Sequence, residues 1–191
     1  MKNYRRYLTA LLMVGALIWW AGSSFAKEDI MDKSNQSAQI KVYSVDEDRF
    51  ITVDRVFKTE EQWKEQLSGE PYEDLAYKIL RRQGTEPAFS GRYAKHTEYG
   101  VYRCAACGQD LFHSDHKYDS GTGWPSYYQP IARENVDFHE DRSFFMVRTE
   151  VVCSRCQSHI GHVFNDGPAP DGERYCMNSA ALLFEPLSRN R

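Results

Sequence analysis

Cysteine is the residue type whose number and spacing say most about the chemistry of this chain. Four of the five cysteines form two Cys-x-x-Cys pairs, Cys104 with Cys107 and Cys153 with Cys156, and the fifth, Cys176, stands alone. A two-residue gap lets a tight turn aim two thiolates at one tetrahedral metal, so two such pairs predict a structural zinc site. Because 45 residues separate the pairs, we expect the metal to join two distant hairpins of one domain.

Each pair has alternative uses. A single Cys-x-x-Cys can be a redox pair, and in an exported chain the pairs could be joined as disulfides. Zinc is favoured because the same spacing occurs twice in one chain. A catalytic zinc is not expected, since four thiolates leave no open position for water or substrate.

The unpaired Cys176 lies in the strand-like segment Arg174-Tyr175-Cys176-Met177-Asn178-Ser179. Alternation along a strand places Arg174, Cys176 and Asn178 on one face. A free cysteine is most often a small buried hydrophobe. Here an arginine would stabilise the thiolate and an asparagine could donate to an oxygen on the attacked atom, so we predict a nucleophile.

A second polar cluster follows the second cysteine pair. His162 and Phe164 share strand parity, whereas His159 lies on the other face unless the chain bends at Gly161. Either histidine could instead be a core residue or support another side chain, and Asp166 alone would be a turn residue.

A third segment runs from Tyr118 to Ser126. Its two glycines, Gly121 and Gly123, let the backbone turn sharply before Trp124. An exposed indole provides an apolar wall for a site, and burial in the core is the alternative.

One domain has to position these residues. With 41% hydrophobic and 14% aromatic residues, the chain can bury one good core. The polar stretch 27–39 predicts a flexible leader, and the domain is expected over 40–191. Apolar residues around Asp46-Glu47-Asp48 are compatible with a hairpin over 41–57.

Two short helices are expected next. The pattern Thr59-x-x-Gln62 predicts a capped helix start, and a second helix begins at Pro71 and stops at Gly84, with its apolar stripe in the core. Beyond Gly84, short apolar segments between turn residues predict antiparallel β structure with long loops, and the segment from Phe144 to Val152 is the predicted central strand. The expected fold class is mainly β, of the α+β type.

The N-terminal segment predicts export. Basic residues precede an apolar run from Leu8 to Ala21, and Ser24-Phe25-Ala26 offers small residues for cleavage, so a signal peptide is expected over 1–26. The run of 14 residues is shorter than the roughly 20 that span a bilayer, which makes a membrane anchor over 8–21 the alternative. We expect a periplasmic or otherwise exported protein.

The charge of the chain argues against nucleic acid as a partner. The net charge is -3 with interspersed signs, and without residues 1–26 it becomes -6, from 21 Lys+Arg and 27 Asp+Glu. Neither value provides a basic surface for a polyanion. A soluble monomer is expected.

Several motifs occur in one order between about Thr59 and Pro186. They are Gly84-Thr85-Glu86-Pro87, the two cysteine pairs, Gly123-Trp124-Pro125-Ser126, Gly161-His162-Val163-Phe164 and Arg174-Tyr175-Cys176-Met177-Asn178-Ser179-Ala180-Ala181-Leu182. Together they resemble the methionine sulfoxide reductase B family. The resemblance implies two antiparallel β-sheets with short helices at the N-terminal side, and a zinc distant from the catalytic centre.

The resemblance also implies a mechanism. Cys176 would attack the sulfur of methionine R-sulfoxide in oxidised proteins and take its oxygen as a sulfenic acid. His162 would supply or organise the proton on that oxygen, with His159 and Asn178 fixing the oxygen. Arg174 would favour the thiolate.

The same resemblance implies three substrate-binding roles. Trp124 would pack on the methyl group of the substrate and thereby select one epimer. Phe164 would line the same pocket, and Asp166 would orient the histidine cluster.

The chain departs from a common family pattern at Thr122, where many members have a resolving cysteine. With zinc on the other four cysteines, an outside thiol must reduce the Cys176 sulfenic acid. A thioredoxin-like or glutaredoxin-like protein, or a small thiol, is the expected reductant.

Two other classes of function remain possible from the sequence. A zinc-ribbon binding module would explain the cysteine pairs, but not the polar face around Cys176. A thiol peroxidase or general disulfide reductase would use Cys176, but has no reason for an indole wall.

Overall fold

The computed structural model describes residues 39–69, 75–143 and 146–189, all within one unit of the chain, residues 32–191. The expected signal peptide lies outside the described residues, and so does the expected leader up to residue 38. None of the helices in the described part combines the length and the apolar character that a membrane crossing requires.

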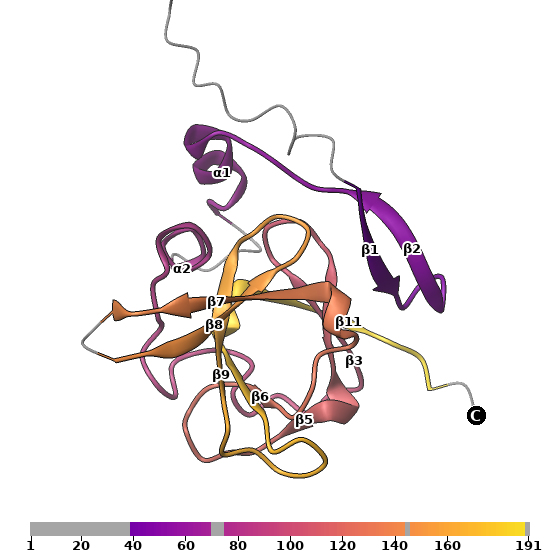
Figure 1. Cartoon of the computed structure of the whole chain (residues 1–191), viewed down its shortest axis with the longest axis vertical. Helices are drawn as coiled ribbons and strands as arrows, with labels where there is room; N and C mark the ends of the chain where they lie inside the picture. The colour runs from indigo at the N-terminus through magenta and orange to yellow at the C-terminus, as the bar shows by residue number, and fades with distance from the viewer. Residues whose placement is uncertain (1–38, 70–74, 144–145, 190–191) are drawn as a thin grey trace, which may run out of the picture. The chain divides into compact units, whose positions relative to one another are not determined.

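Antiparallel β-sheets dominate the described residues (Figure 1). The strands are β1 (Gln39–Ser44), β2 (Arg49–Asp54), β3 (Gly100–Cys104), β4 (Asp110–His113), β5 (Lys117–Tyr118), β6 (Ser126–Tyr127), β7 (Val136–Asp141), β8 (Arg148–Cys153), β9 (His159–Phe164), β10 (Arg174–Met177) and β11 (Leu182–Pro186). In this part of the chain they form a six-stranded sheet in the order β5-β6-β10-β9-β8-β7, a three-stranded sheet in the order β11-β3-β4, and the hairpin β1-β2. The predicted fold class is confirmed.

The register of the six-stranded sheet aligns polar residues across its middle. Cys176 of β10 is paired with Ser126 of β6 on one side and with His162 of β9 on the other. His162 is in turn paired with Glu150 of β8. Residues directly opposite in antiparallel strands share a face and have Cβ atoms about 4.5–5.5 Å apart. The sheet therefore brings residues from four separate segments into one row.

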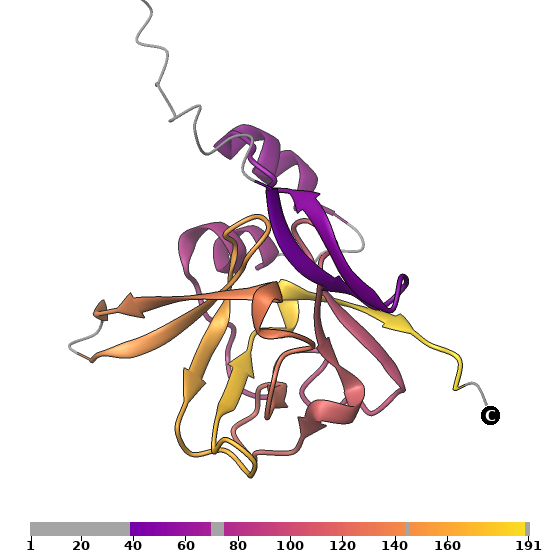
Figure 2. The ribbon, with the colours of Figure 1, turned by 45° about the vertical axis from the view of Figure 1, so that its right-hand side comes forward.

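The predicted central strand is confirmed in position but not in extent. β8 lies between β7 and β9, yet it begins at Arg148, and residues 144–145 lie outside the described residues. β7 and β8 run side by side and project beyond the other strands of their sheet (Figure 2). This projection places Asp141 and Arg148, which are paired, at its far end.

The N-terminal hairpin forms where the sequence predicts it, with β1 and β2 in register from Gln39 opposite Asp54 to Ser44 opposite Arg49. Its attachment uses two buried side chains of the domain. The backbone N–H of Tyr43 donates to Asn135 Oδ1 at 2.8 Å, and that of Val45 donates to Asp110 Oδ2 at 2.8 Å.

Two helices precede the sheets, α1 (Glu60–Gln66) and α2 (Ala76–Arg82). The predicted capping box at the start of α1 is present, with Thr59 and Gln62 bonded to each other's backbone N–H. The start expected at Pro71 lies outside the described residues. At the C-terminal end, Gln83 rather than Gly84 adopts the left-handed conformation, with a φ of 52°. A Cβ at Gly84 would lie 3.0 Å from the carbonyl oxygen of Lys78, a tight contact that glycine avoids.

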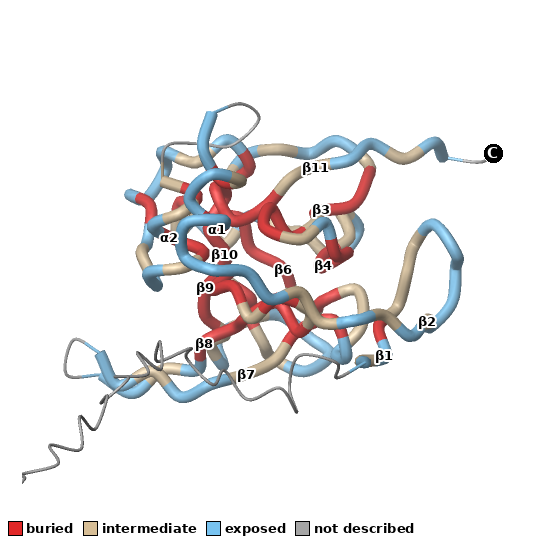
Figure 3. Tube along the Cα trace, turned by 90° about the horizontal axis from the view of Figure 1, so that it is seen from above, coloured by how far each residue is buried: buried red, intermediate tan, exposed pale blue. Residues whose placement is uncertain are grey.

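The core is buried between the two larger sheets and α2. The burial colouring shows that most residues of β3, β4, β6, β9 and β10 are buried (Figure 3). Aromatic rings fill much of this space, and Phe112 and Tyr127 are stacked with centroids 4.4 Å apart. The strands that carry Cys176 and His162 are thus fixed by packing on the face opposite to these two residues.

Candidate active site and metal centre

Cys176 lines a small cavity of about 110 Å³ at the middle of the six-stranded sheet. Cys176 is partly buried and forms no disulfide. Four other residues predicted from the sequence line the same cavity: Trp124, His162, Phe164 and Asn178. Thr85, Arg148, Gly161 and Met177 complete the lining.

Trp124 is held by its loop and by its indole nitrogen. Gly123 has a φ of 90°, and a Cβ there would lie 2.7 Å from the backbone nitrogen of Phe89, so only glycine fits. The indole N–H of Trp124 donates to the carbonyl oxygen of Glu86 at 3.0 Å. The half-buried ring therefore presents an apolar face to the cavity in a fixed orientation.

Asn178 is buried and oriented by two backbone groups. Its Oδ1 accepts from the N–H of Glu86 at 3.0 Å, and its Nδ2 donates to the carbonyl oxygen of Ile160 at 3.0 Å. A side-chain amide has two N–H donors, so one donor remains for a group in the cavity.

His162 is bonded to a carboxylate that the sequence analysis did not identify. Its Nε2 lies 2.8 Å from Asp141 Oδ2, which also accepts from Arg148 at 2.6 Å. Burial lowers the pKa of His162, with Asp141 acting in the opposite sense, so the imidazole is neutral near pH 7. Although burial would raise the pKa of Asp141, hydrogen bonds from Ser143, His162 and Arg148 hold it well below its usual range. The ionised Asp141 accepts a hydrogen bond from Nε2 of His162, so Nδ1 is the nitrogen available for proton exchange.

A β-bulge determines where His159 points. The register between β8 and β9 shifts so that Val151 is paired with Gly161, but Val152 with His159. The extra residue, Ile160, moves His159 onto the face of His162, and the two rings meet edge to face with centroids 5.3 Å apart. The bend that the sequence analysis placed at Gly161 is thus a bulge one residue earlier, because Gly161 stays in register with Val151 and Ile160 is the extra residue.

His159 nevertheless does not line the Cys176 cavity. It borders a separate hollow with His139 and Glu150, and its Nδ1 lies 2.6 Å from Glu150 Oε1. Its Nε2 is buried without a partner. The structure thus places His159 behind His162, where it contacts the ring of His162.

Asp166 pairs with Arg174, in contrast to the predicted role of orienting the histidines. Arg174 Nε donates to Asp166 Oδ1 at 2.8 Å, and Arg174 Nη2 donates to Asp166 Oδ2 at 2.9 Å. The turn after β9 brings Asp166 back over the start of β10, and Arg174 also lies over the Phe164 ring, 4.6 Å from its centroid. The observed contact of Asp166 is therefore with Arg174, and the role at the histidines stays a prediction.

Burial opposes the stabilising effect of the arginine on the Cys176 thiolate. Burial raises the pKa of Cys176, and Arg174 and a hydrogen bond with Thr122 lower it without overcoming that effect. Arg174 does favour the thiolate, as predicted, but the resting group at neutral pH is the thiol. A nearby proton acceptor is therefore needed for attack.

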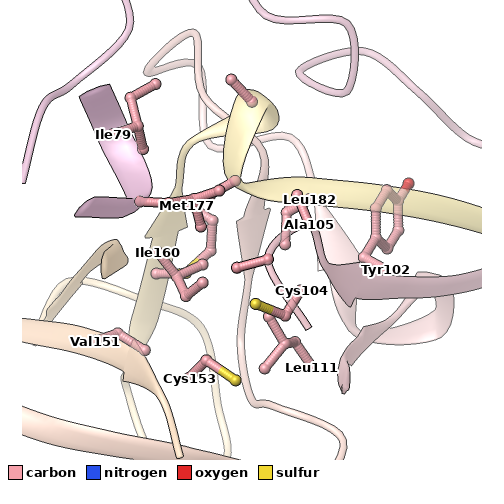
Figure 4. Close-up of a cluster of buried hydrophobic side chains, with 14 of the residues drawn as sticks. Ile79, Tyr102, Cys104, Ala105, Leu111, Val151, Cys153, Ile160, Met177 and Leu182 are labelled. Carbon is pink, nitrogen blue, oxygen red and sulfur yellow. The ribbon is translucent and has the colours of Figure 1, made fainter. Parts of the chain in front are cut away.

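The other four cysteines meet between the two larger sheets. Cys104 ends β3 and Cys153 ends β8, and both lie in the buried cluster (Figure 4). The two turns are alike, because the N–H groups of Gly108 and Gln157 each donate at 2.8 Å to the carbonyl of the first cysteine of their pair. Both residues have a positive φ, 75° for Gly108 and 56° for Gln157.

The geometry of the four sulfurs fits a tetrahedral metal. All four Sγ atoms lie within 4.8 Å of one another, and Cys104–Cys156 and Cys107–Cys153 are 3.7 and 3.5 Å apart. These separations exceed a disulfide bond of about 2.05 Å and match the roughly 3.8 Å edge of a tetrahedron with Zn–S distances of about 2.3 Å. The cluster could hold one zinc ion.

Sequence reasoning missed several residues that build the site. Glu86 lies within a motif that was identified, but its role was not. Its carboxylate accepts from the N–H groups of Ser179 and Ala180, which tie its loop to the segment after β10. Asp141, Arg148 and Glu150 had no local signal, because their contacts depend on strand register.

Comparisons with known proteins agree on one family. The model of the family described as the SelR domain matches residues 72–186, which include all residues of the cavity and the four clustered cysteines. The chain is 57% identical over 130 residues to a peptide methionine sulfoxide reductase MsrB of Methanosarcina barkeri, covering 68% of this chain and 88% of that protein. It is 55% identical over 130 residues to the protein of that name in Methanosarcina mazei, covering 68% and 89%. For the protein of that name in Acinetobacter baumannii, identity is 49% over 136 residues, covering 71% and 94%.

Proposed function

This chain belongs to the methionine sulfoxide reductase B family, and we propose that it reduces the R-sulfoxide of methionine residues in oxidised proteins, with Cys176 as the nucleophile. The observation that carries the proposal is the cavity in which Cys176 meets a half-buried indole, a histidine and a buried asparagine. An apolar wall beside a thiol suits a methyl sulfoxide, which has an apolar methyl and a polar oxygen on the same sulfur.

The reduction begins with proton transfer between paired residues of adjacent strands. Nδ1 of His162 takes the proton of the Cys176 thiol, and the adjacent Asp141 carboxylate stabilises the imidazolium. The imidazolium then protonates the sulfoxide oxygen, which makes the substrate sulfur electrophilic. This order of steps overcomes the raised pKa of Cys176, because one proton transfer forms both the thiolate of Cys176 and the imidazolium that protonates the sulfoxide.

The oxygen transfer conserves atoms and electrons. The Cys176 thiolate attacks the substrate sulfur, and the oxygen with its proton passes to Cys176 as a sulfenic acid. The substrate sulfur gains two electrons and leaves as the thioether of methionine, while Cys176 loses two. The free N–H of Asn178 stabilises the oxygen during transfer, and Trp124 and Phe164 enclose the methyl group.

Other residues of the site act through those that contact substrate. Asp166 holds Arg174, which lowers the pKa of Cys176 against the effect of burial. His159 packs on the ring of His162 and is itself held by Glu150.

Recycling requires a thiol from outside the chain. The chain has five cysteines, and four of them are gathered at the metal centre. An external thiol condenses with the sulfenic acid to give a mixed disulfide and water, and a second thiol releases Cys176 and leaves as the disulfide. A thioredoxin-like or glutaredoxin-like protein supplies such thiols in pairs.

The four clustered cysteines hold one structural zinc ion in this proposal. Four thiolates fill its coordination sphere, so the metal joins the end of β3 to the end of β8 and supplies no reactive position. The N-terminal segment supports an exported location, because a short apolar run follows basic residues and precedes a small-residue cleavage site.

Turnover of separated epimers tests the function. A peptide with methionine R-sulfoxide, or with the S-sulfoxide, is incubated with the protein and a dithiol reductant, and methionine is quantified. We expect turnover of the R epimer alone, and equal turnover or none would refute the proposal. Cys176→Ser should fold, bind zinc and reduce neither epimer. A parallel assay with hydrogen peroxide in place of the sulfoxide peptide distinguishes this function from that of a thiol peroxidase, which would reduce the peroxide.

A further inference from the structure

A second, larger cavity borders the Cys176 cavity. It has a volume of about 890 Å³ and is formed by the end of β7, the start of β8 and the end of β9. Half of its ten lining residues are apolar, and these five define what is called the apolar groove below: Phe138, Met146, Val147, Val163 and Phe164.

The apolar groove exposes hydrophobic side chains to water. Val147 is 69% exposed and Met146 is 52% exposed, and they are two of the five large hydrophobic side chains that are exposed in the described part of the chain. Phe138 and Val163 are partly buried and pack against the core, so they hold the inner wall of the groove in place. Covering such a surface with an apolar ligand releases its water and is favourable.

The groove is continuous with the cavity that holds the thiol. Phe164 and Arg148 line both. Alternation along β9 puts Phe164 on the face of His162 and Val163 on the other face. Since β9 ends at Phe164 while β7 and β8 project further (Figure 2), the groove leads from the cavity round the end of β9.

The sizes of the two cavities suggest how a polypeptide lies across them. The Cys176 cavity, at about 110 Å³, suits a single side chain, so the backbone of a substrate stays outside it. An extended chain advances by about 3.3 Å per residue. A side chain that lies one to three residues from the reacting methionine therefore reaches the groove.

Two charged side chains also line the groove, and both have partners. Arg148 pairs with Asp141, and Glu140 pairs with Arg142. A charged residue of a ligand would lose water beside the apolar groove, and each charge that it meets there already has a partner. The groove therefore favours an apolar occupant.

We propose that the apolar groove binds an apolar side chain of the substrate polypeptide, one to three residues from the oxidised methionine. This inference rests on the proposed function and adds a preference among oxidised proteins. Methionines with apolar neighbours are most often buried, so the preferred substrate is a segment of a core that has opened. The ten lining residues suit such a segment, because a stable interface between folded proteins takes about 20–30 residues on each side.

Peptides that differ in one neighbour of the sulfoxide test the proposal. Each carries one methionine R-sulfoxide and either Leu or Asn, which are similar in size, at one of the positions within three residues of it. With the zinc-loaded full chain and a dithiol reductant, at least one position should favour Leu by about tenfold in kcat/KM, as expected for burial of one aliphatic side chain. The advantage should lie in KM, because the groove lies outside the cavity that holds the reacting sulfur.

Variants of the two exposed groove residues link this preference to the groove. Val147→Ser and Met146→Ser should each reduce the Leu advantage to about threefold, whereas Val147→Ile should keep it. The ratio for the two peptides is compared within each variant, so a general loss of activity cancels. Phe50→Ser, which removes an exposed apolar side chain on β2, is the matched control and should leave the ratio unchanged.

Three outcomes would overturn the proposal. They are equal kcat/KM for the Leu and Asn peptides at every position, a Leu advantage that survives both serine variants, and a dimer of the unsubstituted chain that Val147→Ser dissociates without changing the ratio. The last would assign the groove to a second copy of the chain.

A binding measurement separates this inference from the proposed function. The same peptides with unoxidised methionine carry a fluorescent label, and their anisotropy is measured with the Cys176→Ser protein. Tighter binding of the Leu peptide, lost in Val147→Ser, supports the groove even if no sulfoxide is reduced, and that result would refute the proposed function alone. Reduction of the R-sulfoxide with no preference for Leu in either assay would refute the groove alone.

Discussion

His162 Nε2 lies 2.8 Å from Asp141 Oδ2, so a residue at the far end of the projecting strands bonds to the histidine that is paired with Cys176. This contact fixes the tautomer of His162, because the ionised Asp141 accepts from Nε2 and leaves Nδ1 unprotonated in the neutral ring. Proton exchange with the cavity therefore depends on Asp141.

Asp141→Asn should lower kcat for methionine R-sulfoxide by about 100-fold, the usual contribution of a positioned acid or base. Asp141 acts to raise the pKa of His162 against burial, so its loss lowers that pKa further. The acidic limb of the pH-rate profile should then move to lower pH. Glu140→Gln, an exposed neighbour on β7, is the control, and an unchanged profile in both variants would contradict the role of Asp141.

The division of the cysteines into two pairs and one single residue was predictable from the sequence, because it depends on local spacing. A two-residue gap sets the same turn at Cys104–Cys107 and at Cys153–Cys156, wherever the turns lie in the fold. The helix start at Thr59 was predictable for the same reason, since a capping box involves four consecutive residues.

Contacts that depend on strand register were not predictable. The Asp141–His162 bond requires β7, β8 and β9 to pair in one register, and the position of His159 requires a bulge that no local pattern announces. The role of Asp166 at the histidines was an implication of the family resemblance, and its contact with Arg174 could not be read from the sequence. The turn after β9 directs its carboxylate to Arg174 instead.

Arg174→Gln should raise the pKa of Cys176, since Arg174 acts against the burial that already raises it. Alkylation by iodoacetamide at pH 7 should slow by about tenfold, which corresponds to one pKa unit. The measurement is the rate of modification at residue 176. Arg49→Gln removes an exposed, ion-paired arginine of β2 and should leave the rate unchanged. A faster reaction in the Arg174 variant would show that the guanidinium does not favour the thiolate.

Cys107→Ser should abolish zinc binding and the folded state together. Structural zinc contributes about 10–16 kcal/mol in small zinc domains, and whole domains are stable by only about 5–15 kcal/mol. Zinc content by elemental analysis and thermal unfolding measure the two effects. Cys176→Ser, which removes a cysteine outside the cluster, should retain one zinc and its unfolding temperature. A Cys107 variant with full zinc and unchanged stability would refute a four-cysteine site.

Trp124→Ala should reduce the discrimination between epimers by about 10- to 200-fold, the range expected for one methyl-sized contact in an apolar pocket. The half-buried indole lines the cavity beside Cys176. In the proposed function, one epimer places its methyl on the ring and its oxygen towards Asn178. The measurement is kcat/KM for each epimer.

Trp124→Phe separates the apolar wall from the anchoring bond. Phenylalanine keeps an apolar ring but lacks the N–H that donates to the Glu86 carbonyl, so the ring is less firmly oriented. Discrimination should fall between that of the unsubstituted protein and that of the alanine variant, while zinc content stays the same. If the alanine variant loses kcat/KM equally for both epimers, Trp124 supports the loop rather than selecting the substrate, because a contact with the methyl group must affect the two epimers differently.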